Sequence, residues 1–308
     1  MIKVALQVIA FNVDPWINAM LRNANRHVDK IFIAYPPRPW AYSAYARNNL
    51  VNPTSLNSIE LNGLECEVEV VRGDWKFDED TRNCLLDKAR SEGFDWMVIQ
   101  DADEFYTNES WVRLLNLLKY ESTKNTDLII TPWYNFWKSP EYVIKNIDGT
   151  ITSPNEGFAV KCNGSDVKFI YSRTTNSKQS LFVDEPCYHY SYTISDEQML
   201  TKISTWAHTG EMQNPGLWYK LKWKYWIPSS KNLHPGSPHV WQKAIKFPYA
   251  QPGFVSEIWT GGKLEARKDQ ISLNLLDWLW DMRSWLRMHA RALKRSLRNV
   301  LFNHQSTH

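Results

Sequence analysis

Short apolar runs alternate with helical stretches along the first third of the chain, and no other feature constrains the fold as much. Apolar runs typical of buried strands occupy residues 4–10, 31–34, 66–71 and 96–99. Helical patterns lie between them at 14–26, after the Asp14–Pro15 cap, and at 80–92, before Gly93. Strands that alternate with helices form a mostly parallel sheet with covered faces. The pattern therefore predicts an α/β fold with helices on both faces of a central sheet.

The remainder of the chain follows a different pattern. Leu128–Ile130 is an apolar strand, and segments 157–162 and 167–171 are typical of strands joined by a hairpin turn at Asn163–Gly164. Residues 209–262 are dense in Pro, Gly, Trp and Lys without periodicity, which favours long loops with short helices. A helical pattern resumes at about residue 271. We therefore expect an antiparallel or mixed extension of the sheet, followed by a C-terminal helical extension.

Composition is typical of a soluble globular protein. Of the 308 residues, 43% are hydrophobic and 22% are charged, which excludes disordered and collagen-like chains. No run approaches the roughly 18 apolar residues of a membrane span, and the N-terminus lacks the pattern of a signal peptide. The four cysteines form no C-x-x-C pair, so neither a zinc site nor a redox motif is indicated. We expect a cytoplasmic protein, either free in solution or peripheral to a membrane.

Basic residues gather at the C-terminus. Six cations and no acid follow Asp281, and because the whole chain has a net charge of +3, the rest of it carries −3. The tail combines an apolar stripe with a basic row at i, i+4. The stripe is Leu286, Ala290, Leu293, Leu297 and Val300, and the row is Arg283, Arg287, Arg291 and Arg295. Such a helix suits an anionic membrane or a nucleic-acid backbone, or else packs on its own domain with a solvated basic face.

The stretch Val98–Phe105 is the part of the sequence most informative about chemistry. A buried strand delivers three carboxylates at its carboxyl end, Asp101, Asp103 and Glu104. Ligands of open α/β sheets bind at the carboxyl ends of strands. On an extended chain the side chains of Asp101 and Asp103 project to the same side. Paired hard oxygen donors suit Mg²⁺ or Mn²⁺, which then bridges to a diphosphate.

Two segments carry a resemblance to a known family. Ile99–Phe105 resembles the Asp-x-Asp motif of GT-A glycosyltransferases, in particular those similar to family 2. Thr81-Arg82-Asn83, at the start of the helix before that strand, is similar to the Ala-Arg-Asn element of these enzymes. Residues 1–105 match the family's order of elements, 106–210 share its general layout, and the likeness is absent beyond. The resemblance implies a GT-A fold, which is a Rossmann-like α/β arrangement.

The resemblance also implies a nucleotide-sugar donor held by the first half of the sheet. Asp101 and Asp103 would bind Mn²⁺ or Mg²⁺ on the diphosphate, and Arg82 would stabilise the diphosphate, because a guanidinium matches phosphate oxygens. The family often carries acids after its second strand, whereas this chain has Tyr35–Trp40 there, with Arg38. Tyr35 or Trp40 would then stack on the base, and a UDP-sugar is the favoured donor. The full donor-binding set is Phe11, Asn12, Tyr35, Asp74, Arg82, Asp101 and Lys202.

Later residues complete the expected site. Many GT-A enzymes supply a late histidine as a metal ligand, and His189 and His208 are the candidates here, although a histidine among aromatics also serves structural roles. Imidazole accepts Mn²⁺ readily. Inverting transfer needs a carboxylate that takes the proton of the acceptor hydroxyl. Asp184 and Glu185, after an apolar strand, are the predicted catalytic residues, with Glu104 and Glu156 as rivals. A retaining mechanism stays open.

Aromatic residues are the expected acceptor contacts. These are Trp133, Tyr134, Trp137, Trp218 and Trp223. Residues 218–226 interleave lysines with aromatics, a mixture that suits sugar stacking, a membrane interface or a polyanion with exposed rings; a structural aromatic loop is the alternative. The expected organisation is a donor-binding half at 1–125, an acceptor-binding half of the same domain at 126–215 and the aromatic, basic extension at 216–308.

The sequence therefore predicts a metal-dependent glycosyltransferase of the hexosyltransferase type. The favoured acceptor is a hydroxyl of a glycan or lipid-linked glycan, and the alternative is DNA with hydroxymethylated bases, which the tail would grip. Two other classes remain open. A sugar nucleotidyltransferase also uses metal-binding acids, but it usually has a glycine-rich loop after its first strand, where this chain reads Ala10–Asp14 without glycine. A non-catalytic glycan-binding module would use the tryptophans alone.

Overall fold

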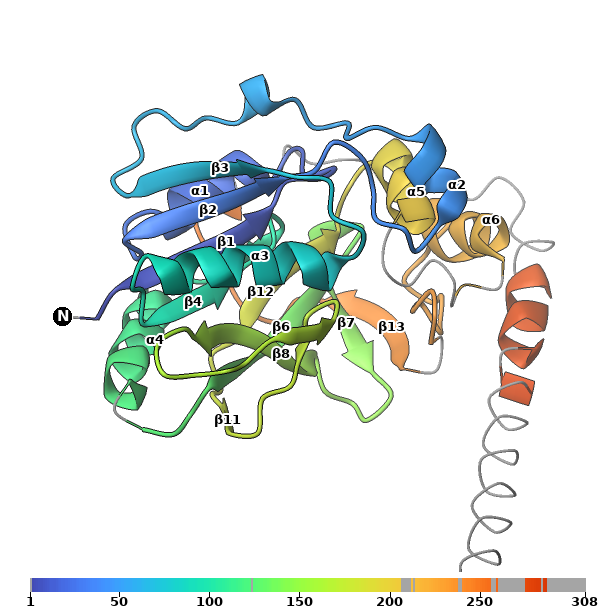
Figure 1. Cartoon of the computed structure of the whole chain (residues 1–308). Helices are drawn as coiled ribbons and strands as arrows, with labels where there is room; N and C mark the ends of the chain where they lie inside the picture. The colour runs from blue at the N-terminus through green and yellow to red at the C-terminus, as the bar shows by residue number, and fades with distance from the viewer. Residues whose placement is uncertain are drawn as a thin grey trace, which may run out of the picture.

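A large mixed β-sheet with helices on both faces forms the centre of the protein (Figure 1). The structure is a computed structural model that describes residues 2–122, 124–205, 212, 214–237, 240–255, 259, 275–283 and 285–286. The sheet order is β13-β7-β6-β8-β4-β1-β2-β3, with β11 and β12 paired to β6 and β5 paired to β12. The predicted α/β class is confirmed.

The N-terminal half of the sheet is parallel, as the alternation of strands and helices predicts. Its strands are β1 (Val4–Ile9), β2 (Lys30–Tyr35), β3 (Glu67–Arg72) and β4 (Trp96–Ile99). Strand β1 lies between β2 and β4, and β3 pairs with β2 at the edge. The central strands β1 and β4 are buried along their whole length, which explains their continuous apolar sequences.

Helices cover both faces of this half. Alternate residues of β1 point to opposite faces. Leu6 packs in one core with residues of α1 (Ile17–Ala24) and α4 (Asn108–Glu121), whereas Ala5 packs in another core with residues of α3 (Asp78–Ser91). The connection from β2 to β3 contains the short helix α2 (Ala44–Asn49) and a single turn at Leu56–Ser58.

The second half of the sheet is mixed. Strands β8 (Thr152–Lys161), β6 (Leu128–Trp137), β7 (Ser139–Asn146) and β13 (Trp241–Lys246) follow β4 in antiparallel order. Strands β11 (Ser180–Phe182) and β12 (Cys187–Tyr192) run parallel to β6. The short strand β5 (Glu104–Phe105) pairs with β12, which sets His189 opposite Glu104. This pairing brings the late histidine to the carboxyl end of β4.

The predicted hairpin at Asn163–Gly164 is wrong. Gly164 has φ +66°, as a turn requires, but the strands on either side of it do not pair. Strand β8 already has β4 on one side and β6 on the other, so it offers no free edge. Strand β9 (Phe169–Tyr171) pairs instead with β10 (Thr174–Thr175) in a separate two-stranded sheet.

The C-terminal part builds a second core that is rich in tryptophan. It includes α5 (Asp196–Thr205), α6 (Pro215–Trp218) and a π-helical turn at Tyr219–Lys224. The expected short helices are therefore present, whereas β13 was not expected, because Trp-Gln-Lys-Ala-Ile-Lys shows no clear alternation. Residues 275–283 are helical, as predicted. His208 and the predicted tail stripe and basic row beyond Leu286 lie outside the described residues.

Within the described ranges, none of the helices combines the length and the apolar character that a bilayer crossing requires.

Candidate functional site

A cavity of about 580 Å³ opens at the carboxyl ends of β1 and β4. Its wall comes from segments far apart in the chain, among them the loop after β1, the turn after β4, α3, β6, the β9–β10 turn, β12, α5 and β13. Eight of the residues expected to form a site line this cavity: Phe11, Asn12, Arg82, Asp101, Asp103, Trp133, His189 and Lys202. It also contains Trp40, the alternative base-stacking residue. The position agrees with the rule that α/β sheets bind ligands at the carboxyl ends of their strands.

Arg82 is the most buried charged group of this wall. The residue is 3% exposed, and its Nε donates to Asp78 Oδ1 at 2.9 Å. Its Nη2 donates to Asp101 Oδ1 at 3.0 Å. Nη1 is buried without a hydrogen-bond partner among the described residues. Arg82 thus links the first turn of α3 to the end of β4, and its Nη1 remains able to donate to a ligand.

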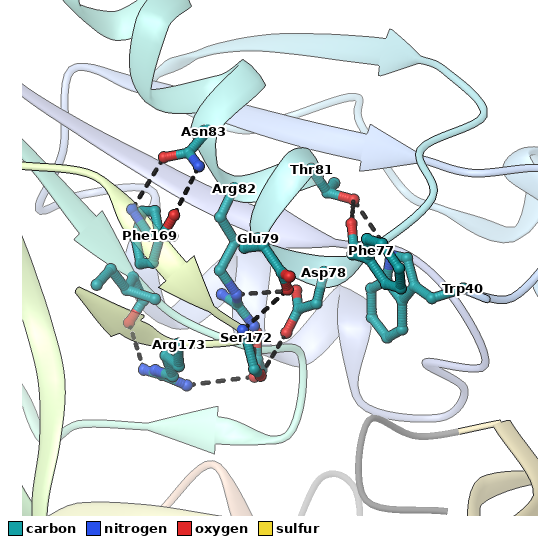
Figure 2. A network of polar contacts seen from close by, with 12 residues as sticks. Trp40, Phe77, Asp78, Glu79, Thr81, Arg82, Asn83, Phe169, Ser172 and Arg173 are labelled. Atoms are coloured by element: carbon teal, nitrogen blue, oxygen red, sulfur yellow. Dashed lines mark hydrogen bonds and ion pairs between the residues drawn. The ribbon is translucent and has the colours of Figure 1, made fainter. Parts of the chain in front are cut away.

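The first two turns of α3 are held against β9 and the β9–β10 turn, as Figure 2 shows. Asn83 Nδ2 donates to the carbonyl of Phe169 at 2.8 Å, and the Phe169 N–H donates to Asn83 Oδ1 at 2.9 Å. The Ser172 hydroxyl donates to Asp78 Oδ2 at 2.7 Å. The two adjacent residues therefore differ in role. The Arg82 side chain lines the cavity, and the Asn83 side chain holds β9 against the helix.

Arg173, in the β9–β10 turn, is a site residue that the sequence analysis missed. Its Nη2 donates to the carbonyls of Ile99 at 2.9 Å and Gly157 at 3.0 Å. The guanidinium also grips both carboxylate oxygens of Glu104 and reaches Asp101 Oδ2 at 3.2 Å. No local motif surrounds Arg173; the contacts between α3 and β9, together with its own hydrogen bonds to the carbonyls of Ile99 and Gly157, hold it here.

The two aspartates of the Asp-x-Asp element do not lie side by side. The N–H of Glu104 donates to the carbonyl of Asp101 at 3.1 Å, so the segment forms a turn and not the extended chain that was expected. Asp101 faces Arg82 and Arg173, whereas Asp103 faces His189 and Lys202. Burial opposes the ionisation of Asp101, but the two arginines lower its pKa to about 2. The negative charge of this carboxylate is therefore already balanced by charges of the protein.

Asp103, Glu104 and His189 form a cluster that could hold a metal ion. His189 Nε2 lies 3.8 Å from Asp103 Oδ1. Burial lowers the pKa of His189 to about 4, so its imidazole is neutral near pH 7. His189 Nδ1 lies 2.6 Å from Asn135 Oδ1, and Asn135 Nδ2 in turn donates to Ser153 Oγ. This chain of bonds assigns the ring proton to Nδ1 and leaves the Nε2 lone pair directed at Asp103.

These groups fit a divalent cation. A neutral nitrogen lone pair that faces a carboxylate is unfavourable unless a proton or a cation lies between them. The distance of 3.8 Å is less than twice a typical metal–ligand distance of about 2.1 Å. Mixed nitrogen and oxygen donors suit Mn²⁺ better than Mg²⁺. Asp101, a predicted ligand, is outside this cluster, and Glu104 takes its place, although Arg173 already binds both oxygens of Glu104.

The role of Asn135 can be tested directly. We expect Asn135→Ala to weaken Mn²⁺ binding by about 10- to 100-fold, since the histidine loses the partner that fixes its tautomer and orientation. Titration of the protein into Mn²⁺, with the free ion followed by electron paramagnetic resonance, measures this change. Asn49→Ala, at an exposed asparagine of α2, is the matched control. Equal Mn²⁺ affinity in the two variants would contradict the role of Asn135 in orienting His189.

Two predicted donor-binding residues lie outside the cavity wall. The Tyr35 hydroxyl donates to the carbonyl of Thr54 at 2.8 Å. Asp74 accepts from Arg47 at 2.9 Å and from Arg38, the residue that replaces the expected acids. Side-chain bonding to Arg38 lowers the pKa of Asp74. Within the described cavity wall, Trp40 is thus the aromatic residue from the β2–β3 connection.

The predicted catalytic carboxylates also lie outside the described wall. Glu185 forms an ion pair with Arg113 of α4, and Asp184 precedes it in the link between β11 and β12. The rival Glu104 is fully buried and bound to Arg173. The side chain of Glu156 is not among the described groups.

The expected acceptor aromatics divide between the cavity and the core. Trp133 lines the cavity, where Arg173 lies 4.9 Å above its ring. Trp137, Trp218 and Trp223 are fully buried in the second core, so they offer no face to a ligand. Tyr134 packs against Tyr188, outside the cavity wall. Trp16 and Trp241 were not expected in the wall but do line it.

Comparisons with known proteins give distant likenesses. No family model matches the chain, and no curated protein matches it in sequence. Among solved structures, S. aureus TarS 1–349 is similar with a TM-score of 0.38 and 9% identity, over 68% of each chain. The 4-diphosphocytidyl-2C-methyl-D-erythritol synthase of Anaerococcus prevotii DSM 20548 gives 0.35 and 13%, over 65% of this chain and 95% of that one. A second S. aureus TarS structure gives 0.35 and 13%, over 66% and 39%. At these values the likenesses do not bear on activity.

Proposed function

We propose that the protein is a metal-dependent glycosyltransferase that takes a nucleotide-sugar donor. The observation that carries the proposal is the pair Asp103 and His189, which face each other across 3.8 Å in a cavity at the carboxyl ends of β1 and β4. Cations line the same cavity as this pair, and they suit a diphosphate. The family resemblance of the Asp-x-Asp and Arg-Asn segments favours the same function.

The metal site in this proposal consists of Asp103 and His189, with Glu104 beside them. A divalent cation bound there supplies a Lewis acid that polarises phosphoryl oxygens of the donor. The residues of the chain do the positioning. His189 is held by Asn135, and Lys202 lies 3.7 Å from Asp103 Oδ2, where it orients the carboxylate. Mn²⁺ is the preferred ion because one of the ligands is an imidazole nitrogen.

The diphosphate of the donor is proposed to lie between Arg82 and Lys202. Both side chains line the cavity, and Arg82 Nη1 has no hydrogen-bond partner among the described residues. Lys202 Nζ is anchored by the carbonyl of Ser191 at 3.2 Å, and so is pre-oriented. Pre-oriented cations stabilise the charge that develops on a leaving diphosphate. No proton transfer is assigned to Asp184 or Glu185, which lie outside this wall.

The remaining walls suggest how the two substrates are arranged. Trp40, fixed by a hydrogen bond of 3.2 Å from its Nε1 to Thr81 Oγ1, is proposed to stack on the nucleoside base, with UDP as the favoured nucleotide. Trp133 lines the cavity with its side chain only partly buried, and it is proposed to stack on a sugar ring. The proposed acceptor is therefore the hydroxyl of a glycan or lipid-linked glycan, and DNA with hydroxymethylated bases is the alternative to be tested beside it.

A donor panel tests the proposed function. We expect the wild-type protein to hydrolyse slowly at least one of a set of UDP- and GDP-sugars with Mn²⁺, and we expect excess EDTA to abolish this activity, because the diphosphate loses its bridging ion. Nucleotide release is measured by chromatography, with and without glycan and hydroxymethylated DNA acceptors. Absence of donor binding across the panel would refute the proposal. Pyrophosphate release from a nucleoside triphosphate and a sugar phosphate would assign a nucleotidyltransferase instead, and chelator-insensitive glycan binding without turnover would assign a binding module.

A further inference from the structure

The C-terminal helix at residues 275–283 exposes its apolar side. Figure 1 shows it in orange-red at the edge of the molecule, away from the central sheet. Helical structure is also described at 285–286. The outer face consists of Leu275, Leu276, Trp278, Leu279, Met282 and Leu286, all between 40% and 58% exposed. These positions recur at three- and four-residue spacing, so they share one side of the helix.

The opposite side of the helix is anchored to the body of the protein. Lys222 is fully buried, and its Nζ lies 2.6 Å from Asp277 Oδ1 and 2.7 Å from Asp281 Oδ1. The two acids are one helical turn apart and therefore point the same way. Trp280, 9% exposed, packs in the second core beside them.

This anchoring determines which side faces outward. If the helix rotated to bury its leucines, Lys222 would remain in the interior without its acids, and an unpaired buried charge costs several kcal/mol. The usual arrangement, with the apolar side inward and the polar side in water, is thus reversed. A contiguous apolar surface of this kind is typical of an interaction site.

The charges around the outer face indicate what it contacts. Arg283 is exposed next to it, and the sequence from there to His308 contains six cations and no acid. A second copy of the chain would bring two such cationic segments together, which is unfavourable. Nucleic acid would match the cations but would leave the leucines and Trp278 in water. A partner with anionic groups above an apolar layer would match both the cations and the exposed apolar side chains.

We propose that the outer face is a docking surface for anionic lipid bilayers, with the helix lying in the plane of the interface. Interfacial helices combine Trp and Leu on the side that enters the membrane with Arg and Lys at its border. Tryptophan is favoured at the level of the lipid head groups. Each cation near an anionic leaflet adds to the affinity. This proposal does not depend on the transferase function, because the outer face and the cavity share no residue.

Vesicle sedimentation with the full chain tests the proposal. We expect binding to vesicles that contain phosphatidylglycerol, weak binding to pure phosphatidylcholine, and a marked loss at high salt. The double variant Leu279→Ser/Met282→Ser should bind at least tenfold more weakly, because it removes two side chains that would enter the bilayer. The matched control is Val112→Ser/Tyr120→Ser, which replaces two exposed apolar residues of α4 and should bind like the wild type. Circular dichroism checks that both variants are folded.

A charge variant provides a second, independent measurement. Arg283→Ser/Arg287→Ser/Arg291→Ser should lose about tenfold or more of its affinity for the anionic vesicles while its unfolding temperature stays unchanged. Three outcomes would overturn the proposal: no binding to anionic vesicles, equal binding by the wild type and the Leu279/Met282 variant, or sedimentation equilibrium showing a dimer that this variant disrupts. Binding of duplex DNA in place of vesicles would likewise overturn it.

Discussion

Asp103→Ala should abolish metal-dependent turnover of the nucleotide-sugar donor while leaving the protein folded. In the proposed site this carboxylate is the oxygen ligand that faces His189, and a bound metal would supply several kcal/mol of charge stabilisation. We expect the rate of donor hydrolysis to fall by about a thousandfold or more, since each 1.4 kcal/mol corresponds to a factor of ten. Mn²⁺ affinity should fall with it. Rates are measured by nucleotide release at saturating Mn²⁺, and affinity by calorimetry.

The matched control for this experiment is Asp87→Ala. Asp87 lies on α3 with 73% of its side chain exposed, and it forms an ion pair with Arg90 at 3.5 Å. We expect wild-type turnover from this variant and a wild-type unfolding temperature from both. If Asp103→Ala retained full metal-dependent activity, the assignment of Asp103 as the metal ligand would be wrong, even if the donor itself were correctly identified.

Of the substitutions proposed for this protein, Arg82→Met should cause the largest loss of stability. Arg82 bonds to Asp78, which is itself 4% exposed, and to Asp101. Removing one partner of a buried ion pair leaves a charge without compensation, and such changes cost about 3–5 kcal/mol. The free energy of unfolding, measured with urea, should therefore fall by that amount at pH 7. The control Arg113→Met breaks an ion pair with Glu185 whose arginine side chain is 58% exposed, and it should cost less than about 1 kcal/mol.

The stability loss in Arg82→Met should depend on pH in a definite direction. Burial raises the pKa of Asp78 even in the wild type, where Arg82 opposes the shift. Without the arginine, the pKa of Asp78 in the folded protein rises further above its pKa in the unfolded chain. A group with a raised folded pKa destabilises the fold as pH rises through the interval between the two values. The deficit against the wild type should thus be smaller near pH 4 than at pH 7 and above. A deficit that grew on acidification would contradict a buried, unpaired Asp78.

The parallel half of the sheet was predictable because its pattern is local. A strand that is buried on both faces must be apolar throughout, so β1, β2 and β4 are visible as short apolar runs. The same holds for the acids that follow β4, because the carboxyl end of a strand is where a parallel sheet binds its ligands. The position of Arg82 near Asp101 follows from the helix that precedes the strand.

The mixed half was harder to predict because strand pairing depends on which edges are free. The Asn163–Gly164 turn is real, yet β8 inserts between β4 and β6 and has no edge left for β9. The lysines and tryptophans of 218–226 carry a pattern that suits a ligand surface as well as a core. Only the packing shows that Trp218 and Trp223 are buried and that Lys222 pairs with two acids nearly sixty residues later.

The sequence by itself determined the α/β class, the parallel order of the first strands and the acids at the end of β4, because each is encoded by neighbouring residues. Tertiary structure decided the composition of the site. Arg173 reaches Asp101 and Glu104 only because Asn83 clamps β9 to α3, and His189 reaches Asp103 only because β12 pairs with β5. It also decided that the two aspartates serve different partners, since a turn replaced the extended chain between them. Such contacts join residues 69 to 86 positions apart, and no pattern within one segment specifies them.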